Sequence, residues 1–310
     1  YHRILYRAIT RTKTSTGSRP DVMTTIKALL AVVLLGCSGF SMAYDFKCVH
    51  EKDTAPPLDQ QADQWFKQAR VLSKERPADW SKVASLYQQA VEKNHWKAMH
   101  NLAELYLRGD GVVKDTNKAI DLYLEMVKLQ VPLGYYDMSV MTKRGVGVVQ
   151  SDRQSVIYLL KAGDVGSPIA QVRLGNIYIY EAKKRDLGVS YLRCAADQND
   201  ASANYELAAY YKIVDRNYPV AMHYYQRAAA LGLEKGSLLI ENTFRDGDFG
   251  YVKNEKIASA YSDISSRLYK DPNLLLPNLA KDYPLPPHPI QGYHADKDIN
   301  WKPTGRDDDY

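Results

Sequence analysis

Small, apolar and aromatic residues recur along this chain in a fixed order. A small residue is followed four positions later by a large apolar residue, directly afterwards by a second small one, and three positions further on by an aromatic. Copies of the pattern begin at Ala98, Gly134, Ala170, Ala203 and Gly236, at intervals of 36, 36, 33 and 33 residues. The copies at Gly134 and Gly236 are the weaker ones. A period of this length is typical of arrays of helical units.

Each of the first four units also carries a second amphipathic segment. Its apolar residues recur at steps of three and four positions, which predicts a helix with one buried face. These second segments are residues 118–124, 156–162, 188–196 and 220–230. Two earlier segments, 62–72 and 83–90, are expected to cap the array. Paired helices that bury their apolar faces only against neighbouring pairs predict an all-α fold, an α-solenoid of about five helical hairpins.

The most specific stretch, residues 98–119, reads Ala-x-x-x-Leu-Ala-x-x-Tyr-x-x-Gly-x-Gly-Val-x-x-Asp-x-x-Lys-Ala. It closely resembles the Sel-one-like repeat, a relative of the tetratricopeptide repeat, and the resemblance covers about residues 80–268. It implies that the solenoid is right-handed. The Gly-Val loop at 108–115 is echoed at 144–149 but is missing from the two 33-residue units, where tighter turns are expected.

The first 43 residues are predicted to be a targeting segment rather than part of the fold. A segment starting at Met23 carries one cation, the apolar run 28–35 and, at 41–43, the small residues of a cleavage site. Together these indicate a secretory signal peptide. The run is too short to cross a bilayer. Cleavage after Ala43 would release a soluble protein, whereas residues 34–37 resemble a lipobox, which would leave Cys37 lipidated and tie the protein to a membrane. The residues before Met23 have either the composition of a mitochondrial transit peptide or that of an over-extended translation start.

Charge and composition add a constraint on the partner. With 45% hydrophobic and 25% charged residues, the chain has an ordinary globular composition. The net charge of +5 lies in residues 1–43, which hold six basic and one acidic side chain, so 35 of each sign remain in the rest. A neutral chain disfavours nucleic acid as the partner, since nucleic acid requires a basic stripe.

Residues 44–79 are assigned to an N-terminal arm and capping helix, 80–268 to the repeat array and 269–310 to a Pro-rich C-terminal segment. Its prolines exclude a long helix or a central strand there and favour an irregular, extended chain. The Pro-Leu-Pro-Pro motif of the C-terminal segment resembles the segment that follows such repeats in exported proteobacterial proteins. The segment is either a flexible tail or a cap docked through Leu274, Leu275, Leu276, Leu279 and Tyr283.

Motifs that carry chemistry are scarce. The Gly-x-Gly loops lack the Lys-Ser/Thr of a phosphate loop, and no Gly-x-Ser-x-Gly turn occurs. The histidines beyond the leader show no metal-ligand spacing; they are His50, His95, His100, His223, His288 and His294. We therefore expect no metal, no cofactor, no small-molecule substrate and no enzyme activity, with an unfamiliar catalytic arrangement as the alternative.

Two cysteines, Cys48 and Cys194, remain beyond Cys37. In an oxidising compartment they either form a disulfide that ties the N-terminal arm to the third full unit or remain free thiols. The resemblance to the repeat places Cys194 at a position that faces solvent, so its thiol is expected to be reachable.

The resemblance to tetratricopeptide stacks implies that the first helix of each pair lines a concave, partner-binding face. Positions two, six and ten after the first small residue should face into it. They supply the candidate residues His100, Glu104, Arg108, Tyr136, Arg144, Asn176, Tyr180, Tyr205 and Asn242. Aromatic residues with charges toward one edge are the composition of a protein-binding surface, and the alternative is a merely solvated groove.

Exported bacterial proteins that this chain resembles include immunity proteins of type VI secretion. The resemblance implies a periplasmic protein that binds and neutralises a secreted effector of the lipase type, above all a phospholipase. A periplasmic adaptor or envelope-stress regulatory scaffold would use the same groove and stays open as the alternative.

Overall fold

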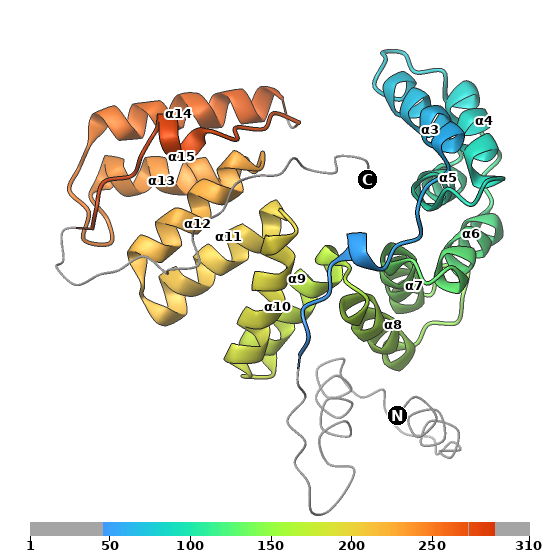
Figure 1. Ribbon diagram of the computed structural model, residues 1–310, viewed down its shortest axis with the longest axis horizontal. Coiled ribbons are helices and arrows are strands. Elements are labelled where there is room, and N and C mark those ends of the chain that lie inside the picture. Colours follow the sequence, from blue (N-terminus) through green and yellow to red (C-terminus); the bar gives the residue numbers. More distant parts are fainter. Residues whose placement is uncertain (1–45, 272, 289–310) are drawn as a thin grey trace, which may run out of the picture. The chain divides into compact units, whose positions relative to one another are not determined.

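The computed structural model describes residues 46–271 and 273–288, all within one compact unit, and this part of the chain holds helices and no strand (Figure 1). The α-helices are α3 (Gln60–Leu72), α4 (Trp80–Val91), α5 (Trp96–Arg108), α6 (Thr116–Lys128), α7 (Pro132–Arg144), α8 (Asp152–Asp164), α9 (Pro168–Asn176), α10 (Arg185–Asp197), α11 (Ala201–Tyr210), α12 (Tyr218–Ala230), α13 (Glu234–Asp246), α14 (Glu255–Lys270) and α15 (Leu279–Asp282). Three shorter helical turns are η1 (Glu51–Asp53), η2 (Ile177–Glu181) and η3 (Tyr211–Asp215).

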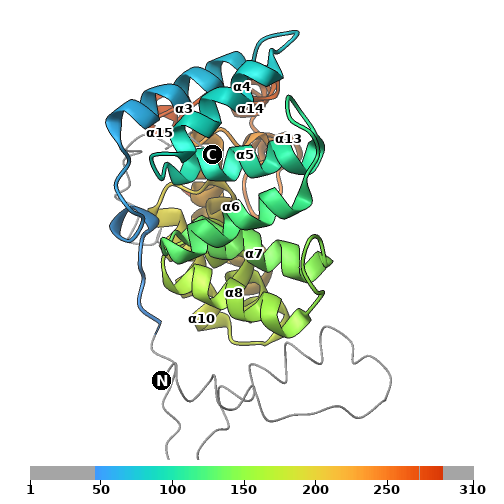
Figure 2. The same cartoon turned by 90° about the vertical axis from the view of Figure 1, so that its right-hand side faces the viewer.

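Consecutive helices pack as hairpins, and the hairpins stack on one another (Figures 1 and 2). Five pairs, from α5 with α6 to α13 with α14, follow a capping pair formed by α3 and α4. Every helix end needs partners for its unpaired backbone groups, and side chains such as Asp115 and Asn254 cap the starts of α6 and α14. The predicted α-solenoid of about five hairpins is thus confirmed.

The repeated small, apolar and aromatic positions lie in the core, except that Tyr106 of the first unit is partly buried. In the weak copy that begins at Gly236, Ile240, Glu241 and Phe244 are each at most 5% exposed, although a glutamate replaces the second small residue. The weak copy that begins at Gly134 is equally buried, with Thr142 at the aromatic position. Burial, rather than residue identity, is therefore what the five units share.

Small residues are required where the two helices of a pair approach each other. A Cβ placed on Gly175 of α9 would lie 2.7 Å from the Leu192 Cγ and 3.0 Å from the Gly188 carbonyl oxygen, both on α10. Distances this short exclude a side chain unless one helix shifts. The period of the sequence thus records the points of closest helix contact.

The connections within pairs are of two kinds. Seven residues join α5 to α6 and α7 to α8, and these loops begin at Gly109 and Gly145, whose φ values of +84° and +68° suit glycine. In the two 33-residue units the first helix continues into a π-helical turn, η2 or η3, and two or three residues suffice to reach the next helix. The tighter turns expected there are present, and the extra π-turn is their physical basis.

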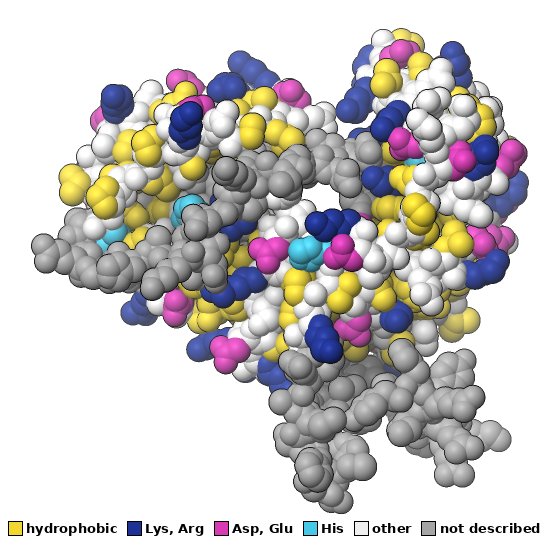
Figure 3. Space-filling view, viewed as in Figure 1, with side chains coloured by type: hydrophobic (Ala, Val, Ile, Leu, Met, Phe, Trp, Pro, Cys, Tyr) yellow, Lys and Arg dark blue, Asp and Glu magenta, His cyan; other side chains and the backbone are white. Residues whose placement is uncertain are grey.

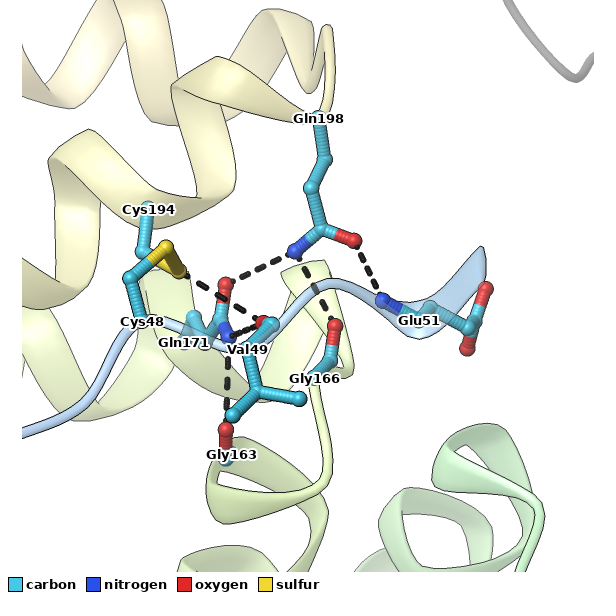
Figure 4. The surroundings of a disulfide bond; sticks show 8 residues. All are labelled: Cys48, Val49, Glu51, Gly163, Gly166, Gln171, Cys194 and Gln198. Atoms are coloured by element: carbon cyan, nitrogen blue, oxygen red, sulfur yellow. Dashed lines mark hydrogen bonds between the residues drawn. A yellow bond between two sulfur atoms is a disulfide. The ribbon is translucent and has the colours of Figure 1, made fainter. Parts of the chain in front are cut away.

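The N-terminal arm, residues 46–59, runs along the edge of the stack where one pair connects to the next (Figure 2). Cys48 is disulfide-bonded to Cys194 of α10. Next to it, the Gln171 amide donates to the carbonyl oxygen of Val49 at 2.9 Å, and the backbone N–H of Glu51 donates to the Gln198 Oε1 at 2.8 Å (Figure 4). The backbone of the arm is therefore bound by α9 and by the connection that follows α10.

Further along, the arm reaches the first repeat unit. The Trp96 indole of α5 donates to the carbonyl oxygen of Pro56 at 3.2 Å, and Leu58 packs against the core of that unit. A Cβ on Gly166, in the connection between α8 and α9, would meet the His50 backbone at 2.5 Å, so the arm lies directly on that turn. The arm also explains why Cys194 is only 1% exposed, contrary to the solvent-facing position expected from the resemblance.

Residues 273–288 pack along the last helices as a cap. The backbone N–H of Leu276 donates to the carbonyl oxygen of Ala230 at 2.9 Å, Leu279 is buried, and the Gln226 amide donates to the Tyr283 carbonyl oxygen at 2.8 Å. As expected, residues 273–288 contain neither a long helix nor a strand, and the one-turn helix α15 interrupts the extended chain that the prolines favour. The turn can form because residues 279–282 contain no proline, so none of their backbone N–H groups is missing.

The signal-peptide features, including Cys37 and the cleavage position after Ala43, lie outside the described residues. Within the described part, each helix is too short or too polar to serve as a membrane span.

Replacing both Cys48 and Cys194 by serine is expected to destabilise the protein. The bridge closes a sequence separation of 146 residues, which corresponds in the loop-entropy model to about 4–5 kcal/mol. Guanidinium chloride unfolding of the double variant and of the wild type, with and without dithiothreitol, measures the loss. Dithiothreitol should lower the midpoint of the wild type and leave that of the variant unchanged; equal midpoints for all four samples would contradict the expectation.

Gly175→Ala is expected to lower the free energy of unfolding by about 1–3 kcal/mol, because overpacking outweighs the better helix propensity of alanine. Ser202→Ala, at an exposed position of α11, is the control and should change it by less than about 0.5 kcal/mol. Thermal and chemical unfolding of both variants measure the difference, and a stabilised Gly175→Ala would refute the close-approach argument.

Candidate functional site: the inner face

The first helix of each pair lies on the inner side of the stack, with the second helix behind it (Figure 1). We call the inner face the surface that α5, α7, α9, α11 and α13, with η2 and η3, present on this side. Every candidate residue lies on one of these elements: His100, Glu104 and Arg108 on α5, Tyr136 and Arg144 on α7, Asn176 at the end of α9, Tyr180 on η2, Tyr205 on α11 and Asn242 on α13.

Two neighbouring helices of the inner face are joined by a buried charged pair. The His100 Nδ1 on α5 donates to the Asp137 Oδ2 on α7 at 2.8 Å, and Asp137 is only 6% exposed. Burial alone lowers the pKa of His100, but the Asp137 carboxylate, assisted by Glu104, outweighs it and holds the pKa above its ordinary value. The carboxylate thus favours the charged form of the imidazole, and the hydrogen bond between them bridges the first two units.

Glu104 is engaged by groups of its own unit. The Tyr123 hydroxyl on α6 donates to the Glu104 Oε1 at 2.7 Å, and the Arg108 guanidinium lies 3.4 Å from the Oε2 and 2.7 Å from Asp110. Burial, together with the nearby carboxylates, raises the pKa of Tyr123, which keeps the hydroxyl a donor. Glu104 and Arg108 thus form a local network on α5.

A cavity of about 320 Å³ opens beside this network. Residues of α5, α7 and α9 line it: Glu104, Tyr136, Asp137, Ser139, Val140, Met141, Lys143, Arg144 and Arg173. Four of the candidates or their direct partners thus meet at one place, namely Glu104, Tyr136, Asp137 and Arg144. The lining of the cavity thus combines two carboxylates, an aromatic ring and aliphatic groups with three cations, of which Arg144 and Arg173 are exposed at its border.

Asn176 and Tyr180 belong to a second cluster, between the third and fourth units. Asn176 hydrogen-bonds the Glu206 carboxylate of α11, yet burial raises the pKa of Glu206. Tyr180 is 40% exposed, lies on the π-turn η2, and is close enough to Glu206 and Tyr210 for electrostatic interaction. This cluster presents tyrosine rings around one half-buried carboxylate.

Tyr205 and Asn242 are placed differently. Tyr205 is half-buried and packs edge-on against Tyr225 with ring centroids 5.5 Å apart, while Lys212 lies over the Tyr225 ring. Asn242 is exposed and accepts a hydrogen bond at 3.1 Å from Arg245 of the same helix. Tyr205 therefore contributes mainly to packing, and Asn242 lies outside both clusters.

Polar residues three positions after the first small residue were not among the predicted site residues. That register holds Asn101, Asp137, Arg173 and Glu206 in the first four units, and three of the four carry a charge. A charged residue directly before the large apolar position, in unit after unit, was the signal that could have found them. They lie between the buried stripe and the open surface, where each can reach the neighbouring unit.

Positive and negative side chains are interspersed with hydrophobic ones on the face shown in Figure 3. The Cys48, His50 and Cys194 side chains bring potential metal ligands within 4.8 Å of one another, but both sulfur atoms are consumed by the disulfide. A cysteine binds a metal as its thiolate, so neither sulfur atom can serve as a ligand while the disulfide is intact.

The stacked hairpins and the mixed inner face define a helical-repeat scaffold of the kind that binds proteins. The family model of the Sel1 repeat matches residues 96–130, 132–167, 168–200 and 201–233, which are the first four repeat pairs. The chain thus contains four Sel1 repeats.

Two solved structures resemble it over nearly their whole length. Immunity protein PA5088 from Pseudomonas aeruginosa is 45% identical, with a TM-score of 0.72, and the match covers 81% of this chain and 97% of that one. Immunity protein Pa5087 from the same organism is 42% identical, with a TM-score of 0.68, over 80% and 97%. DAP3-binding cell death enhancer 1 from Mus musculus is 28% identical over 51% of this chain, and the match spans 32% of that protein.

Asp137→Asn is expected to move the pKa of His100 from above about 6.5 to below it, because burial then acts without the opposing carboxylate. An NMR titration of the His100 ring measures this shift. The raised pKa stabilises the wild-type fold below about pH 6.5, and that stabilisation is lost as the pH rises through the raised value. Asp121→Asn, at an exposed position of α6, is the control and should leave the titration unchanged; an unchanged pKa in Asp137→Asn would refute the pairing.

Proposed function

We propose that this protein is a periplasmic immunity protein that binds and neutralises a phospholipase-type effector delivered by type VI secretion. The observation that carries the proposal is the identity of 42–45% to two proteins named immunity proteins, over 97% of their length. The fold alone would not favour immunity over another binding role.

The inner face supports protein binding by its chemistry. Tyr136 and Tyr180 offer aromatic surface, and the 320 Å³ cavity offers a place for one partner side chain. Tyrosine and arginine are the residues that most often dominate binding energy at protein interfaces. A preformed helical stack also binds at a small cost in conformational entropy.

The effector class and the periplasmic location are parts of the proposal that come from the N-terminal pattern and the family resemblance. A segment with a signal-peptide pattern precedes the fold, and a disulfide is suited to an oxidising compartment. An effector that attacks the periplasmic side of a membrane would have to be met there.

Co-expression tests the immunity role. The secreted toxin encoded beside this gene is directed to the periplasm of a sensitive host, with and without this protein. Survival should require the protein with its leader, and a version without residues 1–43 should not protect. Equal killing in the presence and absence of the protein would refute immunity and leave the adaptor or envelope-stress scaffold as the better candidate.

The combined substitution Tyr136→Ala and Tyr180→Ala should weaken binding to that toxin by at least about 30-fold, since truncation of interface aromatics commonly costs 2 kcal/mol or more. Calorimetry measures the dissociation constant, and circular dichroism checks the fold. Tyr269→Ala, at a 75%-exposed position of α14, is the matched control and should change affinity by less than about threefold. Full affinity of the double variant would exclude this part of the inner face.

A further inference from the structure

Two cations at the border of the inner-face cavity have no counter-ion within the described residues. Arg144 ends α7 and Arg173 lies on α9, and both are exposed lining residues of the cavity. The third lining cation, Lys143, pairs with Asp152 at 2.7 Å, and neighbouring Arg108 pairs with Asp110 and Glu104. The described ion pairs thus satisfy every cation here except Arg144 and Arg173.

The carboxylates of the cavity cannot serve these arginines, because each is already engaged. Asp137 accepts a hydrogen bond from His100, and Glu104 accepts one from Tyr123 and lies beside Arg108. The network holds four carboxylates, those of Glu104, Asp110, Asp137 and Asp152, against the basic groups of His100, Arg108 and Lys143. Arg144 and Arg173 add two cations without a described counter-ion, so five basic groups lie here beside four acidic ones.

The same feature does not recur in later units. The position of Arg144 is occupied by Tyr180, Ile213 and Asp246 in the following three pairs, and that of Arg173 by Glu206 in the next. A pair of free guanidinium groups beside a cavity is therefore a property of the junction between the second and third units. Guanidinium groups bind carboxylates through two parallel hydrogen bonds, and exclusion of water strengthens such contacts.

We propose that this cavity receives an aspartate or glutamate side chain of the partner protein, which Arg144 and Arg173 clamp against the wall formed by Tyr136 and Val140. The inference rests on the proposed function, since it deepens the binding of a toxin by the inner face. It assigns the basic border to recognition of a single acidic side chain rather than to general attraction of an anionic surface. Both carboxylates that line the cavity have hydrogen-bond donors of their own, which weakens their repulsion of an incoming carboxylate.

The test uses the full mature protein and the toxin encoded beside its gene. The double variant Arg144→Gln with Arg173→Gln should bind that toxin at least about 30-fold more weakly and with a smaller dependence on salt, since a charge pair at a buried contact is lost. The control Arg185→Gln with Arg267→Gln removes the same charge at exposed positions of α10 and α14 and should change affinity by less than about threefold. Because the double variant keeps every buried residue, circular dichroism should show an unchanged fold.

A second variant, Arg144→Glu with Arg173→Glu, makes the acidic group identifiable. Among toxin variants with single surface aspartates or glutamates changed to lysine, one should recover binding to this charge-reversed protein. Equal affinity of the wild type and the glutamine double variant overturns the clamp but leaves the proposed function intact. Failure of the wild type itself to bind overturns both. A last experiment titrates inorganic phosphate at constant ionic strength. If phosphate binds saturably through the two arginines while the affinity for the toxin is unchanged in the double variant, the cavity is a small-anion site and the proposal is overturned.

Discussion

Close contact between the two helices of each pair is the constraint on which the rest of the structure depends. Gly175 shows it most directly, because even a methyl group would collide with Leu192 and the Gly188 backbone of the facing helix. A pair packed this tightly exposes one apolar flank on each side, which only the next pair can cover. The interval between small residues in the sequence therefore sets the helix spacing, the stacking and the residues that remain on the inner side.

The inner face gains its character from residues that sit just beside this packed stripe. Asp137, Arg173 and Glu206 share one register, yet their roles differ because their neighbours differ. Asp137 is satisfied by His100 across a unit boundary, Glu206 is met by Asn176, and Arg173 has no described counter-ion. One repeated position thus supplies a structural bridge, a half-buried acid and a free cation, which is how a regular scaffold acquires an irregular binding surface.

The repeat pattern was sufficient to predict the helical pairs, their number and the tighter turns of the short units, because helix periodicity and helix contact are local properties of sequence. The Glu104 and Arg144 positions could be placed on one face for the same reason. The His100 and Asp137 pair could not be predicted, since it depends on how two units are rotated against each other. The path of the arm could not be predicted either. Gln171 and Gln198 form hydrogen bonds with its backbone, and such bonds do not depend on which side chains the arm carries. The short helix α15 was not predicted, because the prolines on both sides of it favoured an extended chain.

The disulfide between the arm and α10 also determines how the molecule carries mechanical load. Cys48 and Cys194 enclose the capping pair, the first two repeat pairs and α9 within one covalent loop. A force that pulls on the chain ahead of Cys48 passes through the sulfur atoms directly into the third pair. Every helix from α3 to α9 is thereby shielded from tension, and that shielded stretch includes the cavity bordered by Arg144 and Arg173.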